Sequence, residues 1–327
     1  MGLLVEGTWH DRWYETSHTG GRFVRQKSKF RHWIGNDEDS EFLPEANRYH
    51  LYVSLACPWA HRTLIFRTLK GLENVISVSI VDPIMGAQGW GFSQGYGGSG
   101  DPVNSASHLH EIYSLAEPGF TGRVTVPTLW DKKKKTIVNN ESSEIIRMFN
   151  SAFDGVTNPE AQKLDFYPEA LRDQIDSINE QIYHDVNNGV YKVGFATTQD
   201  AYEEAFSALF DRLDQLEALL GRQRYLVGDQ LTEADWRFFT TLIRFDAVYH
   251  GHFKCNQRRI ADYPNLWEYT RELYQTPGVA ETVDLDQIKT HYYASHESIN
   301  PTRIVPRGPL IDFEKPHRRD RLPRRAA

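Results

Sequence analysis

The spacing of the apolar residues changes along the chain, and each change predicts a different element. Apolar and polar side chains alternate from Tyr49 to Leu55, which is typical of a β-strand. Apolar residues then recur with a helical period over residues 58–70, and a second β-branched stretch follows at residues 75–81. A strand, a helix and a strand in this order predict a βαβ unit, whose two strands are parallel.

Two shorter strands are predicted after this unit, at residues 128–131 and 136–139, on either side of Lys132–Lys135. A run of lysines in this place is typical of the exposed turn of an antiparallel hairpin. The first of these strands directly follows Val126–Pro127. We expect a cis peptide bond there, because cis bonds occur almost only before proline.

The elements predicted after residue 139 are all helices. Polar residues 140–143 precede an apolar helical pattern at residues 144–149, so a helix begins here. Ser142 either caps this helix or helps to hold a carboxylate at its N-terminus. Thr232 and Asp235 have the spacing of a helix start. Apolar side chains recur with helical spacing in four later segments, residues 168–186, 199–220, 232–249 and 265–275.

Three segments lack a sustained period. Residues 1–46 are predicted to be an irregular extension, residues 83–122 a long Gly-rich insert, and residues 291–327 an extended, Pro-rich and basic tail. Trp90 stands between two glycines of the insert. It is either a packing anchor or a contact to a ligand, since loops near a site often carry its contacts.

Composition limits the possible functions. The chain has 327 residues, 40% hydrophobic and 25% charged, which is typical of a soluble globular protein with two domains. A net charge of −7 argues against nucleic-acid binding. No apolar run is long enough for a membrane span, and the polar N-terminus does not resemble a signal peptide. With only two cysteines, a cytoplasmic location is expected.

Cys57 is the candidate nucleophile. Pro58 is favoured at the first position of a helix, so Cys57 is predicted to be the N-cap residue. The N–H groups and the dipole of the helix then favour the thiolate and lower the pKa of the thiol. The alternative is a buried, unreactive cysteine. Ala60 stands where a dithiol enzyme has its second cysteine, and Cys255 is far away in sequence, so we expect the partner thiol to be a small molecule.

No metal site is expected. The pairs His108/His110 and His250/His252 could suggest metal ligands, the second with Cys255 nearby. Neither pair has a known zinc-ligand spacing, so structural or solvent-facing histidines are the favoured interpretation.

Several motifs resemble one known family. The predicted order of elements is that of a thioredoxin-like domain followed by a helical domain, as in the glutathione transferases. The chain more narrowly resembles the glutathionyl-hydroquinone reductases, or Xi-class transferases. The resemblance is carried by SLACPWAHRT at 54–63, GRVTVPTLWD at 122–131, VNNESSEIIRMFN at 138–150, GDQLTEADW at 228–236 and HYYASHESINPTRIVPRGP at 291–309.

This resemblance implies an α/β plus all-α fold and a division into domains. The glutathione-binding, thioredoxin-like domain would span residues 47–155 and the all-helical domain residues 165–290. It also implies site residues. These are Cys57 as the catalytic thiol, Tyr191 and Tyr292 as catalytic tyrosines, Trp90, Arg123, Val126, Glu141 and Ser142 for glutathione, and His291 and Tyr293 for the quinone ring.

The implied reaction is reduction of an S-glutathionyl hydroquinone, with glutathione as co-substrate and a Cys57–glutathione mixed disulfide as intermediate. A homodimer is implied as well, with glutathione and glutathionyl-quinone conjugates as the partners. Two alternatives remain open. One is an omega-like thiol transferase or dehydroascorbate reductase, and the other is a non-catalytic interaction module with the same fold.

Overall fold

The computed structural model describes residues 2–37, 39–93 and 97–323. The chain divides into two compact units. The first comprises residues 1–13, 26–164 and 282–295, and the second comprises residues 14–25, 165–281 and 296–327. Each unit is described by itself below.

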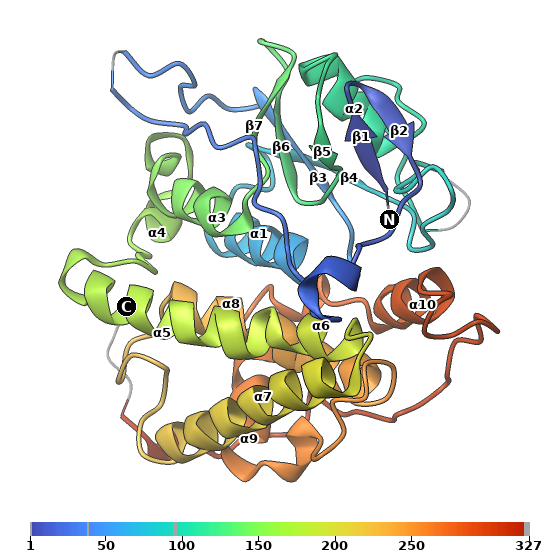
Figure 1. Cartoon of the computed structure of the whole chain (residues 1–327). Helices are drawn as coiled ribbons and strands as arrows, with labels where there is room; N and C mark the ends of the chain where they lie inside the picture. Colours follow the sequence, from blue (N-terminus) through green and yellow to red (C-terminus); the bar gives the residue numbers. More distant parts are fainter. Residues whose placement is uncertain (1, 38, 94–96, 324–327) are drawn as a thin grey trace. The chain divides into compact units, whose positions relative to one another are not determined.

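A four-stranded sheet forms the core of the first unit (Figure 1). Its order is β4-β3-β6-β7, with β3 parallel to β4 and antiparallel to β6. The hairpin β6–β7 is antiparallel, as the sequence predicted. All residues of β3 and β6 are buried, because both are inner strands. The bounds are β3 Tyr49–Val53, β4 Ser77–Ile80, β6 Thr128–Asp131 and β7 Thr136–Asn139.

Helices α1 (Pro58–Leu69) and α3 (Ser142–Ser151) pack against each other in the first unit (Figure 1). Pro58 begins α1, and the chain leaves the helix at Gly71, whose φ of 61° suits glycine. The apolar face of α3 is buried. The insert contributes helix α2 (Leu109–Ala116), which contacts β7.

A second, smaller sheet was not predicted. Strands β1 (Leu3–Val5) and β2 (Thr8–His10) form a hairpin, and β1 also pairs with β5 (Gly122–Arg123). The N-terminal residues are therefore not wholly irregular, and their sheet ties them to the end of the insert. Strands of two or three residues are too short to show a period of two in the sequence.

The second unit is helical, and its longest helix, α7, spans Gln199–Leu220 as predicted. Helices α5 and α8 each continue into a π-helical turn, at Tyr183–Asn187 and Phe245–Tyr249. The two helical segments predicted here, residues 168–186 and 232–249, therefore each cover an α-helix together with π-helical residues. The other bounds are α5 Arg172–Ile182, α6 Gly189–Gly194, α8 Glu233–Arg244 and α9 Pro264–Tyr274. The short helix α4 (Pro159–Gln162) belongs to the first unit.

The C-terminal residues are used by both units. Helix α10 (Leu285–Ser295) belongs to the first unit and runs across the boundary expected at residue 290. Residues 296–318 form no helix or strand, in keeping with the expected tail. The tail is nevertheless anchored, because the buried Arg319 donates to Glu272 Oε2 at 3.0 Å and to the carbonyl of Leu220 at 3.0 Å.

A buried carboxylate organises the start of α8. Asp235 accepts hydrogen bonds from the backbone N–H of Thr232 at 2.8 Å, from the N–H of Leu226 at 2.8 Å and from the hydroxyl of Tyr269 at 2.7 Å. The predicted helix start at Thr232 is confirmed as a capping box. Burial raises the pKa of Asp235 to about 6, and the hydrogen bonds, which lower the pKa, offset only part of this effect.

We therefore expect Asp235→Ala to destabilise the protein by about 3 kcal/mol, because it leaves buried donors without an acceptor. The measurement is the free energy of unfolding in urea. Asp200→Ala is the control, since Asp200 also lies in the first turn of a helix but is exposed. Equal losses in the two variants would contradict the assigned role of Asp235.

Candidate active site

Cys57 is the N-cap residue of α1, as predicted. Its backbone is extended, with φ −77° and ψ 122°, and its carbonyl accepts the first helical hydrogen bond from His61. The thiol is partly exposed, and its Sγ lies 3.6 Å from the carbonyl oxygen of Val126. The expected cis bond at Val126–Pro127 is confirmed. The thiol and the turn before Pro127 therefore lie side by side.

The second thiol has a different environment. Cys255 is fully buried, and burial raises its pKa well above the ordinary value, with Lys254 opposing this. A neutral, inaccessible thiol is a poor nucleophile. The structure thus leaves Cys57 as the accessible thiol of the two.

The N-terminus of α3 carries two predicted site residues, Glu141 and Ser142. Glu141, not Ser142, is the N-cap, because its Oε1 accepts from the backbone N–H of Ser143 at 3.2 Å. Its Oε2 accepts from the hydroxyl of Ser28 at 3.1 Å. The capping role considered for Ser142 was wrong, and its buried hydroxyl instead accepts from Arg62 Nη1 at 3.4 Å.

Trp90 and His291 come together from the insert and from α10. Their rings stack with centroids 4.7 Å apart and planes at 24°. Both are buried, and His291 Nδ1 lies 2.9 Å from the carbonyl oxygen of Pro83. The carbonyl of Trp90 accepts from the N–H of Leu109, the first residue of α2. The stack therefore fixes Trp90 between two helices of the first unit.

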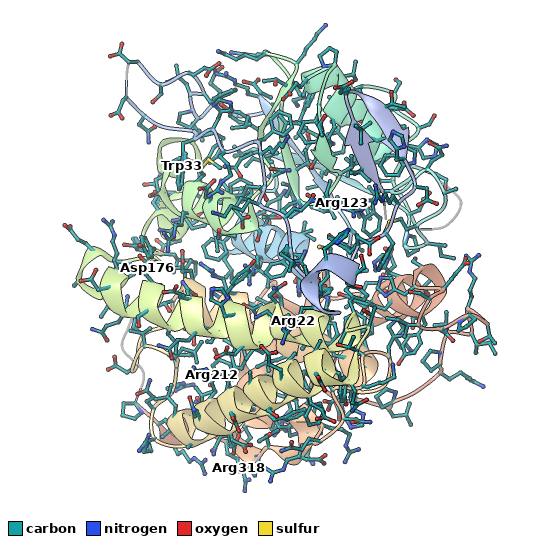
Figure 2. All side chains as sticks on the ribbon, viewed as in Figure 1. Arg22, Trp33, Arg123, Asp176, Arg212 and Arg318 are labelled. Carbon is teal, nitrogen blue, oxygen red and sulfur yellow. The ribbon has the colours of Figure 1, made fainter. Side chains whose placement is uncertain are left out.

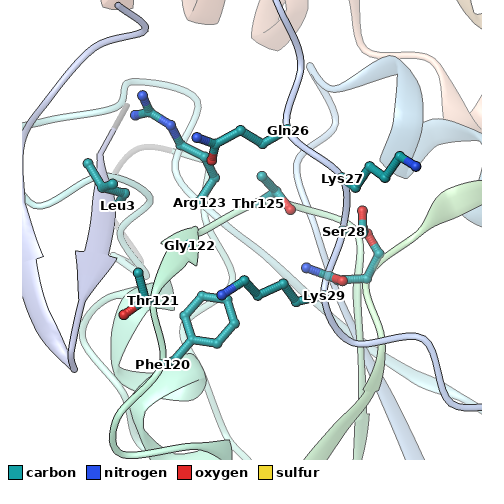
Figure 3. A pocket seen from close by; sticks show the side chains of 11 residues that line it. Leu3, Gln26, Lys27, Ser28, Lys29, Phe120, Thr121, Gly122, Arg123 and Thr125 are labelled. Carbon is teal, nitrogen blue, oxygen red and sulfur yellow. The ribbon is translucent and has the colours of Figure 1, made fainter.

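Arg123 is held by backbone carbonyls. It lies in β5 (Figure 2), and its guanidinium donates to the carbonyls of Arg12 and Trp13, the latter at 2.9 Å. The residue also lies in the wall of a cavity, next to Gly122 and near Thr125 (Figure 3). The N-terminal extension thus sets the position of a predicted glutathione contact.

The predicted tyrosines belong to different units. Tyr292, on α10 of the first unit, is buried with its ring 5.2 Å from that of His291, and Tyr293 is half-buried. Tyr191, on α6 of the second unit, lies among aromatic rings, with the Arg25 guanidinium 4.9 Å above its own ring. Arg25 also donates to Asn188 Oδ1 at 2.9 Å.

Sequence reasoning missed several residues around the thiol. Arg62, which donates to Ser142, stacks on the ring of Trp59 at 4.6 Å. His61 Nε2 lies 2.8 Å from Thr282 Oγ1. His61 and Arg62 stand about one helical turn after Cys57, and that spacing could have indicated them. No sequence signal pointed to Ser28, since its partner is far away along the chain.

The histidine pairs have distinct surroundings. Among the described residues, His108, His110 and Glu111 form the one group whose ligand atoms lie within 4.8 Å of one another. His252 Nε2 lies instead 3.1 Å from His296 Nδ1. Over the same part of the chain, no helix is both long and apolar enough to cross a membrane.

Comparison with known proteins defines the class. The models of the glutathione S-transferase N-terminal and C-terminal domains match residues 56–152 and 199–272. The predicted fold, a thioredoxin-like domain followed by a helical one, is thereby confirmed. The class is that of the glutathione transferases.

Individual relatives narrow this class to a family. Glutathionyl-hydroquinone reductase YqjG of Escherichia coli is 55% identical, covering 98% of this chain and 99% of its own. Glutathionyl-hydroquinone reductase PcpF of Sphingobium chlorophenolicum is 57% identical, with 94% and 96% covered. The chain belongs to the glutathionyl-hydroquinone reductase family, the Xi class of glutathione transferases.

Solved structures agree with this assignment. A Xi-class transferase from Natrialba magadii superimposes with a TM-score of 0.92 at 51% identity, covering 99% of this chain and 98% of its own. The glutathione-bound structure of YqjG from E. coli K-12 gives 0.89 at 51% identity, with 98% and 99% covered.

The contrast between the two thiols gives a prediction. At neutral pH, iodoacetamide should alkylate Cys57 and leave Cys255 unmodified in the folded protein, because only Cys57 is accessible. Peptide mass spectrometry measures the modification at each site. Unfolding in urea is the control, since it should make both thiols reactive. Rapid alkylation of Cys255 in the folded protein would contradict the assignment.

Proposed function

We propose that this chain reduces S-glutathionyl hydroquinones to hydroquinones, with Cys57 as the nucleophile and glutathione as the reductant. The observation that carries the proposal is the placement of the partly exposed Cys57 thiol at the N-cap of α1. A helix N-terminus stabilises a thiolate. The relatives named as reductases of this kind support the choice of substrate.

The first step forms the mixed disulfide. The Cys57 thiolate attacks the glutathione sulfur of the conjugate, so that an S–S bond forms as the carbon–sulfur bond breaks. The ring carbon takes a proton as the hydroquinone leaves, which requires a general acid. The conjugate is reduced by two electrons, and Cys57 is oxidised to its disulfide with glutathione.

The second step restores the thiol. A second glutathione thiolate attacks the glutathione sulfur of the mixed disulfide and releases glutathione disulfide and the Cys57 thiolate. This step needs no second cysteine, which agrees with Ala60 at the position where a dithiol enzyme would carry one. The cycle is covalent, ping-pong catalysis.

Glutathione recognition is assigned to the N-terminus of α3 and to the segment before Pro127. An extended peptide pairs well with an extended backbone, which suits the residue Val126. The carboxylate of Glu141 suits the ammonium group of the γ-glutamyl end, with Ser142 beside it. Arg123 suits a carboxylate, since a guanidinium binds one bidentately. Trp90 provides an apolar wall and is fixed by its stack with His291.

The ring of the hydroquinone is assigned to tyrosines. A phenol can donate a proton, so Tyr191 and Tyr292 are proposed as acids and Tyr293 and His291 as further contacts. The Arg25 guanidinium packs over the ring of Tyr191 and helps to hold the ring in place.

A thiol transferase remains the second candidate. A relative from Schizosaccharomyces pombe, 50% identical over 91% of this chain, is named glutathione S-transferase omega-like 2. Such an activity would use the same thiol and glutathione contacts without needing an acid.

The homodimer and the cytoplasmic location stay predictions of the same proposal. The cytoplasm is expected because a free thiolate requires a reducing compartment.

Glutathione affinity tests the assigned contacts. Arg123→Ala and Glu141→Gln should each weaken binding roughly ten- to hundredfold, because a hydrogen bond to a charged group is worth about 1.5–3 kcal/mol. Calorimetric titration of glutathione gives the Kd. Glu141→Gln keeps the size of the N-cap side chain, and the exposed Arg222→Ala is the control. Unchanged Kd values in both site variants would remove the proposed contacts.

The tyrosines separate the two candidate activities. Tyr191→Phe and Tyr292→Phe keep the ring and remove the hydroxyl, so conjugate reduction should fall by about 10²–10⁴-fold, the usual value of general acid catalysis. Reduction of a small glutathione mixed disulfide should change little, because its thiolate leaving group needs less help. Both rates are measured by glutathione disulfide release. A parallel fall in both activities, or no fall in either, would contradict the proposed role of the tyrosines.

A further inference from the structure

A cavity of about 280 Å³ lies in the first unit, between the segment Gln26–Lys29 and the strand β5 (Figure 3). Its volume is just below the range of typical ligand pockets, so it suits a molecule smaller than a drug. Apart from Arg123, none of the predicted glutathione contacts lines it. The predicted glutathione site therefore does not account for this cavity.

The charged residues that line the cavity are all positive. Lys27, Lys29 and Arg123 line the cavity, and among the described lining residues none is acidic. Both lysine side chains are exposed, and Lys29 Nζ lies 5.4 Å from the centroid of the Phe120 ring. The nearby carboxylate of Glu141 is already bonded to Ser28 and Ser143. The net positive wall favours an anion.

A buried acceptor also belongs to the wall. Asn140 is 5% exposed, and its Oδ1 has no hydrogen-bond partner among the described residues. The orientation of the amide follows from Tyr113. Its hydroxyl donates to the carbonyl of Thr125 at 2.8 Å, so the Asn140 atom facing it at 3.0 Å must be the donor Nδ2. Oδ1 therefore requires a donor from elsewhere, since buried polar groups are normally paired.

Leu3 and Phe120 add apolar surface to a wall that also contains the neutral polar residues Gln26, Ser28, Thr121 and Thr125, and Gly122 keeps the cavity open. A Cβ atom at Gly122 would lie 3.0 Å from Cζ of Phe120 and 3.7 Å from Cδ of Lys29. Phe120 is buried, and Leu3 of β1 also lines the cavity (Figure 3). A ligand thus meets positive charge, one unpaired acceptor, neutral polar side chains and an apolar surface together.

We infer that this cavity binds a small organic carboxylate that has an apolar body and also carries an O–H or N–H donor. The carboxylate would pair with Lys29, whose side chain extends over the Phe120 ring (Figure 3), and the donor would satisfy Asn140 Oδ1. The inference does not depend on the proposed reaction, because it uses neither Cys57 nor the tyrosines. It predicts a ligand site next to, and distinct from, the glutathione site.

Three matched probes separate these interactions. 4-Hydroxybenzoate has the anion and the donor, benzoate lacks the donor, and phenol lacks the anion. In calorimetric titrations of the full chain, 4-hydroxybenzoate should bind about tenfold more tightly than benzoate, which leaves the buried Asn140 Oδ1 unpaired. It should bind about two- to fivefold more tightly than phenol, which loses only an ion pair to an exposed lysine. Equal affinity for the three probes would overturn the inference.

Two exposed lysines allow a variant that preserves folding. Lys29→Met should weaken 4-hydroxybenzoate binding about two- to fivefold and leave phenol binding unchanged, since only an ion pair to an exposed lysine is lost. Lys135→Met, at the exposed tip of the β6–β7 hairpin, is the matched control and should bind as the unmodified protein does. Equal behaviour of the two variants would place the probe outside this cavity.

Competition with glutathione distinguishes the two sites. At saturating glutathione, 4-hydroxybenzoate should still bind, with its Kd changed by a limited factor through the shared Arg123. A Kd that rises in proportion to glutathione without limit would mean that the cavity is part of the glutathione site. That result would overturn the proposal of a separate site while leaving the proposed reaction intact.

Discussion

The contact between the Cys57 thiol and the Val126 carbonyl depends on the pairing of two buried strands. Tyr52 of β3 lies opposite Thr128 of β6, so the end of one strand meets the start of the other. Cys57 follows β3, and Val126 precedes β6. A shift of that register by one residue would turn every side chain of β6 to the opposite face and move the turn away from the thiol. The position of Cys57 beside Val126 thus depends on the pairing of two buried strands.

The N-terminal extension has a second influence on the same region. Strand β1 of its hairpin pairs with β5, and the carbonyls of Arg12 and Trp13 accept hydrogen bonds from the guanidinium of Arg123. Ser28, further along, donates to Glu141 at the start of α3. Two predicted glutathione contacts, Arg123 and Glu141, are therefore positioned by residues for which no catalytic or binding role is predicted. The extension belongs to the architecture of the site, although it lies outside the thioredoxin-like domain.

Local patterns made much of this fold predictable. The alternation at residues 49–55 and the Cys57–Pro58 pair gave β3, α1 and the N-cap, and the lysine run gave the β6–β7 hairpin. Long-range pairing could not be predicted in that way. The stack of Trp90 on His291 joins the insert to α10, and no spacing encodes it. A capping role was considered for Ser142, because serine is a favoured N-cap residue. The extended backbone instead lies at Glu141, which makes Glu141 the N-cap, and residue type alone could not show this.

The two units share the chain in an interleaved order. The first unit includes residues 282–295, which lie between two segments of the second, and the second includes residues 14–25, which lie between two segments of the first. Arg319, near the end of the described chain, neutralises Glu272 in the interior of the second unit. During synthesis, neither unit can be completed until almost the whole chain has left the ribosome. A fragment cut at residue 164 would lack α10, and one that begins at residue 165 would lack the segment that carries Arg25. Folding of this protein is thus expected to be largely post-translational, with the last segments to emerge closing both units.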